Sequence, residues 1–317
     1  MYAVTGGAGF IGSNLVHRLG EITGEPVLVV DDMTDGTKFR NLVGAGVQDY
    51  LDTSEFLDWL VENGDQNVKA VFHLGACSDT TEWNGRFMMR NNFTYSKEVL
   101  NICLAYRIPF IYASSAAVYG MASGFREKVG AEAPINDYGY SKALFDQYAM
   151  RSARSAQSQV VGLRYFNVYG PREAHKGKMA SVAYHHFRQM QETGRVKLFE
   201  GCDGYGDGEQ RRDFVYVDDV VNVKLWWLEN PGVTGVFNCG TGRAEAFNRI
   251  GEAVIDFFGY GSIDYVPFPE SLLGSYQSFT QADMTALQEA GYNQQFRTVK
   301  EGVRNYMEWL TAYEQAS

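Results

Sequence analysis

The chain has 317 residues, of which 45% are hydrophobic and 21% charged, which is typical of a folded globular protein and argues against disorder. Lys and Arg total 28 against 38 for Asp and Glu, so the formal net charge is −10. This acidity argues against general electrostatic binding to nucleic acid or to an anionic membrane. No stretch has the length of a membrane-spanning helix, and the sequence opens inside an expected strand, so we expect no signal peptide.

Short apolar runs alternate with helical patterns along the first half of the chain. Each run is continuously apolar rather than alternating, as in strands that are buried on both faces. Their regular succession with helices predicts an α/β fold, a doubly wound parallel sheet of the Rossmann type with right-handed crossovers. The expected strands lie at residues 3–4, 27–30, 70–72, 110–113 and 160–163.

The pattern changes after Tyr169, where Gly170-Pro171-Arg172 interrupts the run. Helices are expected at 182–190 and 298–313, with a Gly- and Asp-rich loop at 201–208. We expect a smaller, mostly C-terminal substrate-binding domain over the carboxyl edge of the sheet, where ligands bind in open α/β sheets. The expected dinucleotide-binding domain covers residues 1–167 plus about 214–243, and the substrate-binding domain about 168–213 plus 244–317.

The four cysteines are far apart in the sequence and none belongs to a CxxC pair. This spacing indicates neither a zinc cluster nor a disulfide framework. We therefore expect no metal site, and reduced thiols in a cytoplasmic protein. The four residues are Cys77, Cys103, Cys202 and Cys239.

The strongest local signal is the segment 5–12, in which Gly6, Gly9 and Gly12 form a GxxGxxG pattern between a strand and a helix. A backbone without side chains can approach a pyrophosphate closely, and the helix that follows offers free N–H groups and a positive dipole end. The spacing is typical of short-chain dehydrogenase/reductase proteins. The position of the motif, directly after the first strand, favours dinucleotide binding over a purely structural turn.

Asp31 ends the second strand, 31 − 12 = 19 residues after the last glycine of the motif, and Asp32 follows it. A carboxylate at this point usually binds the adenosine ribose and favours NAD. Lys38, a few residues further on, can offset the repulsion between this carboxylate and a 2′-phosphate. The chemistry of these residues leaves NAD and NADP open.

Tyr138 and Lys142 form a YxxxK pair on one face of an expected helix. An ammonium beside a phenol favours the phenolate and lowers its pKa from about 10, so that the phenol can exchange protons with an alcohol near neutral pH. Ser115, at the carboxyl end of a strand, is the expected third member of the group. The alternative interpretation of the pair, an exposed helix start, is disfavoured by the glycine turn upstream.

Beyond these motifs the chain resembles the extended short-chain dehydrogenase/reductases that act on nucleotide sugars. Among them it resembles the ADP-L-glycero-D-manno-heptose 6-epimerases over essentially its whole length. The wider resemblance lies in FHLGA (72–76), VYG (118–120), LRYFNVYGP (163–171) and RDFVYVDDV (212–220). The narrower one lies in DGTKF (35–39), GACS (75–78), TTEW (80–83), PRE (171–173) with HKG (175–177), and FTQAD (279–283).

The resemblance implies inversion of C6 of the heptose, through transient oxidation to a ketone and return of the same hydride from a tightly held NADP, with NAD as the alternative. It assigns proton transfer to Tyr138 and Lys176, with Lys142 and Ser115 as the other catalytic residues. It also implies a role in lipopolysaccharide precursor synthesis and a homo-oligomer, with pentamers known in the family.

Two sets of binding residues follow from the glycine turn and the resemblance. The implied cofactor-binding residues are Gly6, Gly9, Phe10, Ile11, Gly12, Asp31, Asp32, Lys38, Leu74, Gly75, Ala76, Cys77, Ser78, Asn91, Lys142, Val168 and Lys176. The implied substrate-binding residues are Ser115, Asn167, Lys178, His185, Phe199, Glu200, Gly201, Cys202, Arg212 and Tyr276.

The sequence departs from the family pattern at Thr53 and Lys178, where a lysine and a small serine are common, and in a longer 203–210 segment. Two other readings stay open. One is a different nucleotide-sugar epimerase or dehydratase; against a dehydratase, Ser115 is followed by Ala116-Ala117 instead of an Asp-Glu pair. The other is a cofactor-binding protein without activity, which the presence of both Tyr138 and Lys142 disfavours.

Overall fold

The computed structural model describes residues 1–64, 67–122, 124–128, 130, 132–270 and 276–316. Within this part of the chain, seven parallel strands form one sheet in the order β11-β6-β5-β4-β1-β2-β3. The predicted doubly wound α/β fold is therefore confirmed. The strands are β1 (Tyr2–Thr5), β2 (Val27–Asp31), β3 (Asp49–Asp52), β4 (Ala70–His73), β5 (Phe110–Ser115), β6 (Val160–Tyr165) and β11 (Gly235–Cys239).

Successive residues of these strands pack into two cores on opposite faces of the sheet. Val27 and Val29 contribute to the core under α1 (Phe10–Thr23) and α7 (Val217–Glu229). Leu28 and Val30 contribute to the other core, under three further helices. The strands need continuous apolar runs because helices cover both faces of the sheet. These three helices are α2 (Phe56–Asn63), α4 (Tyr95–Ala105) and α5 (Asp137–Ala153), with the short α3 (Gly85–Met89) before α4.

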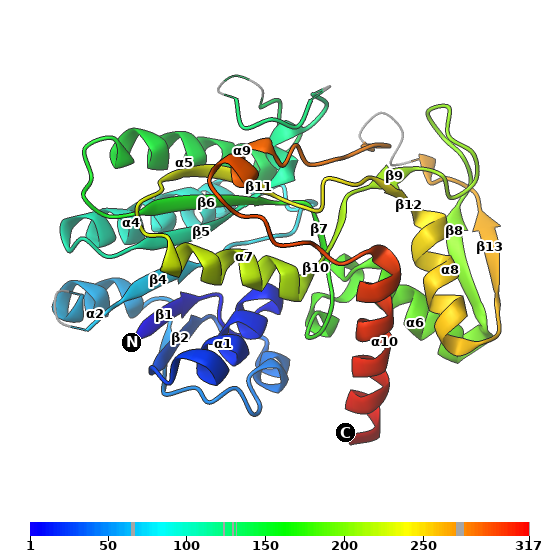
Figure 1. Cartoon of the computed structure of the whole chain (residues 1–317), viewed down its shortest axis with the longest axis horizontal. Helices are drawn as coiled ribbons and strands as arrows, with labels where there is room; N and C mark the ends of the chain where they lie inside the picture. Colours follow the sequence, from blue (N-terminus) through cyan, green and yellow to red (C-terminus); the bar gives the residue numbers. More distant parts are fainter. Residues whose placement is uncertain (65–66, 123, 129, 131, 271–275, 317) are drawn as a thin grey trace.

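A smaller lobe with its own apolar core lies beside the carboxyl end of the sheet (Figure 1). The predicted amphipathic tail is confirmed as α10, in which Val303, Tyr306 and Met307 are fully buried. The main elements of the smaller lobe are α6 (Val182–Thr193), β8 (Arg195–Phe199), α8 (Phe247–Phe258), β13 (Ser262–Val266) and α10 (Val299–Ala316). The short helix α9 (Thr285–Glu289) packs instead beside β11 of the large sheet.

Two short strand pairs connect the lobes: β7 (Asn167–Tyr169) with β10 (Phe214–Tyr216), and β9 (Arg211–Arg212) with β12 (Glu245–Ala246). The chain leaves the large sheet after β6 and returns to it with α7 and β11. The division into domains drawn from the sequence stays a prediction. No helix among the described residues has the length and apolarity needed to cross a membrane.

Candidate active site

The glycine turn joins β1 to α1 at the point where the strand order of the large sheet reverses. Gly6 has a φ of 66°, and a Cβ on it would lie 2.6 Å from the backbone nitrogen of Gly75. A Cβ on Gly12 would overlap the carbonyl oxygen of Gly6. Only glycines allow this packing, which brings bare backbone and the N-terminus of α1 to the sheet edge where a pyrophosphate binds.

Asp31, at the end of β2, has both carboxylate oxygens engaged. The Ala8 backbone N–H donates to Oδ2 at 2.8 Å, and the Lys38 ammonium donates to Oδ1 at 3.0 Å. Lys38 also donates to the backbone oxygen of Asp32 at 2.7 Å. The lysine predicted to offset the carboxylate is therefore paired with it directly.

The end of β4 forms the neighbouring wall. The Thr5 hydroxyl accepts hydrogen bonds from the N–H groups of Leu74 and Gly75, at 3.2 and 3.1 Å. It also contacts His73 Nδ1 at 2.8 Å, and Nε2 of that ring contacts Ser96 Oγ at 2.8 Å. Burial lowers the pKa of His73 to about 3, so this ring is neutral. Our sequence interpretation did not assign Thr5 to the site, although its place between β1 and the glycine turn was a usable signal.

The predicted catalytic group forms where α5 begins beside the end of β5. The Asn136 side chain caps the helix by accepting from the Gly139 N–H at 2.8 Å, which fixes the first turn that carries Tyr138. Lys142 follows one turn later and is buried, and its ammonium donates to the Ala113 carbonyl at 2.9 Å.

The expected low pKa of Tyr138 is wrong for this structure. Burial raises the pKa of the phenol, and contact with the Ser115 hydroxyl lowers it only in part. The Lys142 charge is not among the causes, because its ammonium is directed to Ala113. Burial also lowers the pKa of Lys142 to about 8, against the opposing effect of Asp146. The spacing of four residues placed the two side chains on one helix but could not give the balance between burial and charge.

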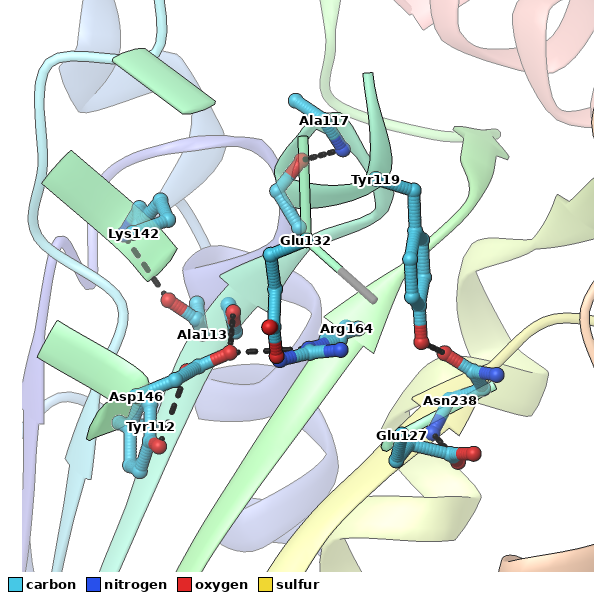
Figure 2. A network of polar contacts seen from close by, with 12 residues as sticks. Tyr112, Ala113, Ala117, Tyr119, Glu127, Glu132, Lys142, Asp146, Arg164 and Asn238 are labelled. Carbon is cyan, nitrogen blue, oxygen red and sulfur yellow. Dashed lines mark hydrogen bonds and ion pairs between the residues drawn. The ribbon is translucent and has the colours of Figure 1, made fainter. Parts of the chain in front are cut away.

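A buried ion network lies one helical turn beyond Lys142 (Figure 2). Asp146 accepts hydrogen bonds from Tyr112 at 3.0 Å, Ser114 at 2.9 Å and the Arg164 Nε at 2.9 Å. Arg164 also pairs with Glu132 at 2.7 Å. Burial raises the pKa of Asp146, and the Arg164 charge opposes this. The network ties α5 to β5 and β6 and so fixes the helix that carries the catalytic pair.

Lys176 lies in a 3₁₀ segment, Ala174–Met179, which connects β7 to α6 of the smaller lobe. Its ammonium is 5.4 Å from the centre of the Phe10 ring, at the start of α1. Burial lowers the pKa of Lys176, and the Glu173 carboxylate opposes that shift. The predicted second proton-transfer group therefore lies against the wall formed by the glycine turn.

Arg212 provides the cationic group on the side of the smaller lobe. Its guanidinium carbon lies 4.7 Å from the centre of the Tyr276 ring and 5.7 Å from that of Phe247. Burial lowers the pKa of this guanidinium, although the group stays charged at any physiological pH. A planar cation that lies near two aromatic rings suits a phosphate or an anionic diphosphate.

One cleft of about 1500 Å³ joins these features. Single small-molecule sites span about 300–1,000 Å³, so the cleft has room for a dinucleotide and a second ligand together. All the predicted catalytic and cofactor-binding residues line it, together with five of the ten substrate-binding ones. These five are Ser115, Asn167, Phe199, Arg212 and Tyr276.

The other five predicted substrate-binding residues are not part of the cleft wall. Lys178, Glu200 and Gly201 are exposed, and His185 and Cys202 are half-buried. Cys202 Sγ accepts from Gln210 Nε2 at 3.4 Å, which holds the 201–208 loop at its base. Among the described residues, no group of three or more His, Cys, Asp or Glu side chains is arranged to hold a metal ion.

The parallel sheet, the glycine turn at its reversal point and the Ser115–Tyr138–Lys142 group together define a dinucleotide-dependent enzyme of the short-chain dehydrogenase/reductase class. The model of the NAD dependent epimerase/dehydratase family matches residues 2–240. The chain belongs to this family, and it is an epimerase by its likeness to the relatives described next.

The chain is 58% identical over 309 residues to an ADP-L-glycero-D-manno-heptose-6-epimerase of Alkalilimnicola ehrlichii, covering 97% of each protein. Its structure is similar to that of the Helicobacter pylori ADP-L-glycero-D-manno-heptose-6-epimerase, with a TM-score of 0.85, 31% identity and 98% and 96% of the two chains covered. The Thermotoga maritima UDP-glucose 4-epimerase, crystallised with UDP-glucose, gives a TM-score of 0.82 with 30% identity over 99% of each chain.

Proposed function

We propose that this protein interconverts ADP-D-glycero- and ADP-L-glycero-D-manno-heptose by inverting C6 of the heptose. The identity of 58% to a heptose epimerase over nearly the whole chain carries the substrate assignment. The cleft supports the chemistry, since the groups needed for oxidation and reduction of a secondary alcohol line one space that is large enough for two ligands.

NADP is the proposed cofactor, and it would accept and return one hydride at C6. The close-packed backbone at Gly6 and Gly12 fits its pyrophosphate. The pairing of Lys38 with Asp31 favours NADP over NAD, because the ammonium neutralises the carboxylate that would repel a 2′-phosphate and keeps its third N–H for that group. Thr53 also lines the cleft, and it counts against NADP, because relatives of this kind often have a lysine at this position.

Proton transfer is assigned to Tyr138 and Lys176. Inversion requires the intermediate ketone to present each face in turn, so the C6 oxygen changes position and needs a proton partner in both. Tyr138 serves one position, with Ser115 as a hydrogen-bond partner of the same oxygen. Lys176 serves the other position, and Lys142 orients the nicotinamide ribose.

The direct test is incubation of the purified protein with ADP-D-glycero-D-manno-heptose, followed by NMR of the sugar. The expected result is a mixture of the two C6 epimers with no net oxidation. Conversion of UDP-glucose or dTDP-glucose in its place would refute the substrate assignment. Mass spectrometry of the ligand released from the same preparation identifies NADP or NAD.

We further propose a cytoplasmic homo-oligomer, with a pentamer as the candidate assembly, that supplies a heptose precursor of lipopolysaccharide. This proposal rests on the resemblance to the heptose epimerases described above. Sedimentation analysis of the purified protein gives the number of subunits, and a monomer at micromolar concentration would contradict the assembly.

A further inference from the structure

The segment 170–181, which we call the lysine loop, carries Lys176 and is held firmly from the side of the large lobe. The Asn14 side chain on α1 donates to the Pro171 carbonyl at 2.9 Å and accepts from Arg172 at 2.8 Å. Arg172 has a φ of 70°, in the left-handed region that side chains other than glycine rarely adopt. A strained backbone persists only where its surroundings determine it, and such strain gathers at functional sites.

Glu173 holds the same loop from inside. It is fully buried, and its carboxylate accepts from the Ser181 N–H and hydroxyl, each at 2.6 Å, and from the Gly170 N–H at 3.3 Å. One side chain thus joins the first and last residues of the lysine loop. Ser181 Oγ also accepts from the Tyr184 N–H at 3.3 Å, so the same contact fixes the start of α6.

The charge of Glu173 also reaches Lys176. Among the described residues, this carboxylate is the one charged group that opposes the effect of burial on the Lys176 pKa. Burial raises the pKa of Glu173 itself, and the hydrogen bonds from Ser181 and the charge of Lys176 oppose that rise. The remaining titratable groups around the two come from the same 3₁₀ segment and from other elements. His175 lies next to Lys176 in the chain, Lys38 acts on His175 from the 36–41 segment, and Tyr306 on α10 faces Glu173.

We propose that Glu173 is a positioning residue for Lys176, closing the lysine loop with its buried carboxylate and keeping a negative charge in the surroundings of the ammonium. The inference rests on the proposed function, in which Lys176 transfers a proton at C6. Glu173 is not among the described residues that line the cleft, so it acts through Lys176 and not on the substrate.

The test compares Glu173→Gln with Glu173→Asp and with Asp213→Asn. Asp213 is the matched control, because it is also fully buried and bonded to backbone N–H groups but is not among the charges that act on Lys176. The reactivity of Lys176 towards acetic anhydride, followed by mass spectrometry across pH in each holoenzyme, gives its titration midpoint without any sugar substrate.

Removing the negative charge destabilises the ammonium, so Glu173→Gln should move the Lys176 midpoint to lower pH, and the limb of the rate profile that Lys176 governs should move with it. The kcat of Glu173→Gln should fall by about 10–100-fold, because Lys176 is then misplaced. Glu173→Asp should restore the midpoint but not the full rate, and Asp213→Asn should leave the midpoint unchanged. An unchanged midpoint in Glu173→Gln, or an equal shift in Asp213→Asn, overturns the proposal.

Ser181→Ala provides a second readout that does not depend on the charge change being tolerated. It removes one donor to Glu173 and should increase deuterium exchange in peptides from the lysine loop; unchanged exchange overturns the anchoring role. Failure of the wild-type protein to epimerise ADP-heptose would refute the proposed function instead, and it would leave the labelling midpoints to decide the link between Glu173 and Lys176.

Discussion

The two walls of the cleft are built in different ways. The wall beside the glycine turn comes from strand ends and one tight turn, and its contacts are largely backbone N–H groups and short side chains such as Thr5. The wall of the smaller lobe combines β9, the start of α8 and Tyr276, and depends on long side chains such as Arg212. A cofactor that many enzymes share binds to the same backbone arrangement in each of them, whereas the substrate is selected by side chains that converge from distant parts of the chain.

The largest effect is expected from Tyr138→Phe, at the start of α5. Loss of the hydroxyl removes a proton-transfer group, so kcat should fall by about 10³-fold or more while the cofactor stays bound. NMR of ADP-heptose turnover and mass spectrometry of the released cofactor measure the two quantities. Tyr140→Phe is the matched control, because that ring is 53% exposed on the same helix and should leave the rate unchanged. A Tyr138→Phe enzyme with near wild-type kcat would contradict the assignment.

Lys176→Met should have the next largest effect. The methionine keeps much of the side-chain volume against Phe10 but cannot transfer a proton, so we expect a loss of about 10²-fold in kcat with cofactor retained. Epimerisation assays over a range of pH provide the measurement, with the exposed Lys197→Met as the control. Turnover at the wild-type rate would mean that one group serves both positions of the C6 oxygen.

The fold and the cofactor wall could be predicted because they follow local rules. Continuous apolar runs mark strands covered on both faces, and the glycine spacing marks the turn. β3 was not found, since the Asp49–Asp52 strand lies at the sheet edge, is half-exposed and has no apolar run. Such an edge strand is defined by pairing with β2 and not by its own sequence.

The remainder of the site depends on long-range packing. Asp146 and Arg164 are 18 residues apart, and their pairing emerges only when α5 packs on β6. Glu173 reads in the sequence as an ordinary loop acid, because nothing local shows that it is fully buried. The expected lowering of the Tyr138 pKa was wrong for the same reason, because burial, which the sequence does not show, raises that pKa.

Lys38→Ala tests the cofactor wall alone. Loss of the ammonium leaves Asp31 uncompensated, so the preference for NADP over NAD should fall by about tenfold, the cost of one charge-assisted hydrogen bond. Binding of both dinucleotides to protein stripped of cofactor gives the ratio. Arg40→Ala, an exposed cation in the same 3₁₀ segment, is the control for a general charge effect. An equal loss in the two variants would argue that Lys38 acts only through net charge.

Arg212→Lys tests the substrate wall and should have the smallest effect. Lysine keeps the charge but loses the planar guanidinium that lies against Tyr276 and Phe247, so binding of the nucleotide sugar weakens while the chemistry at C6 is unaffected. We expect KM to rise by about tenfold at nearly constant kcat. Arg211→Lys, exposed on the same strand, should leave both constants unchanged. A fall in kcat with constant KM would instead place Arg212 at the reacting carbon, and the division of labour between the two walls would then be wrong.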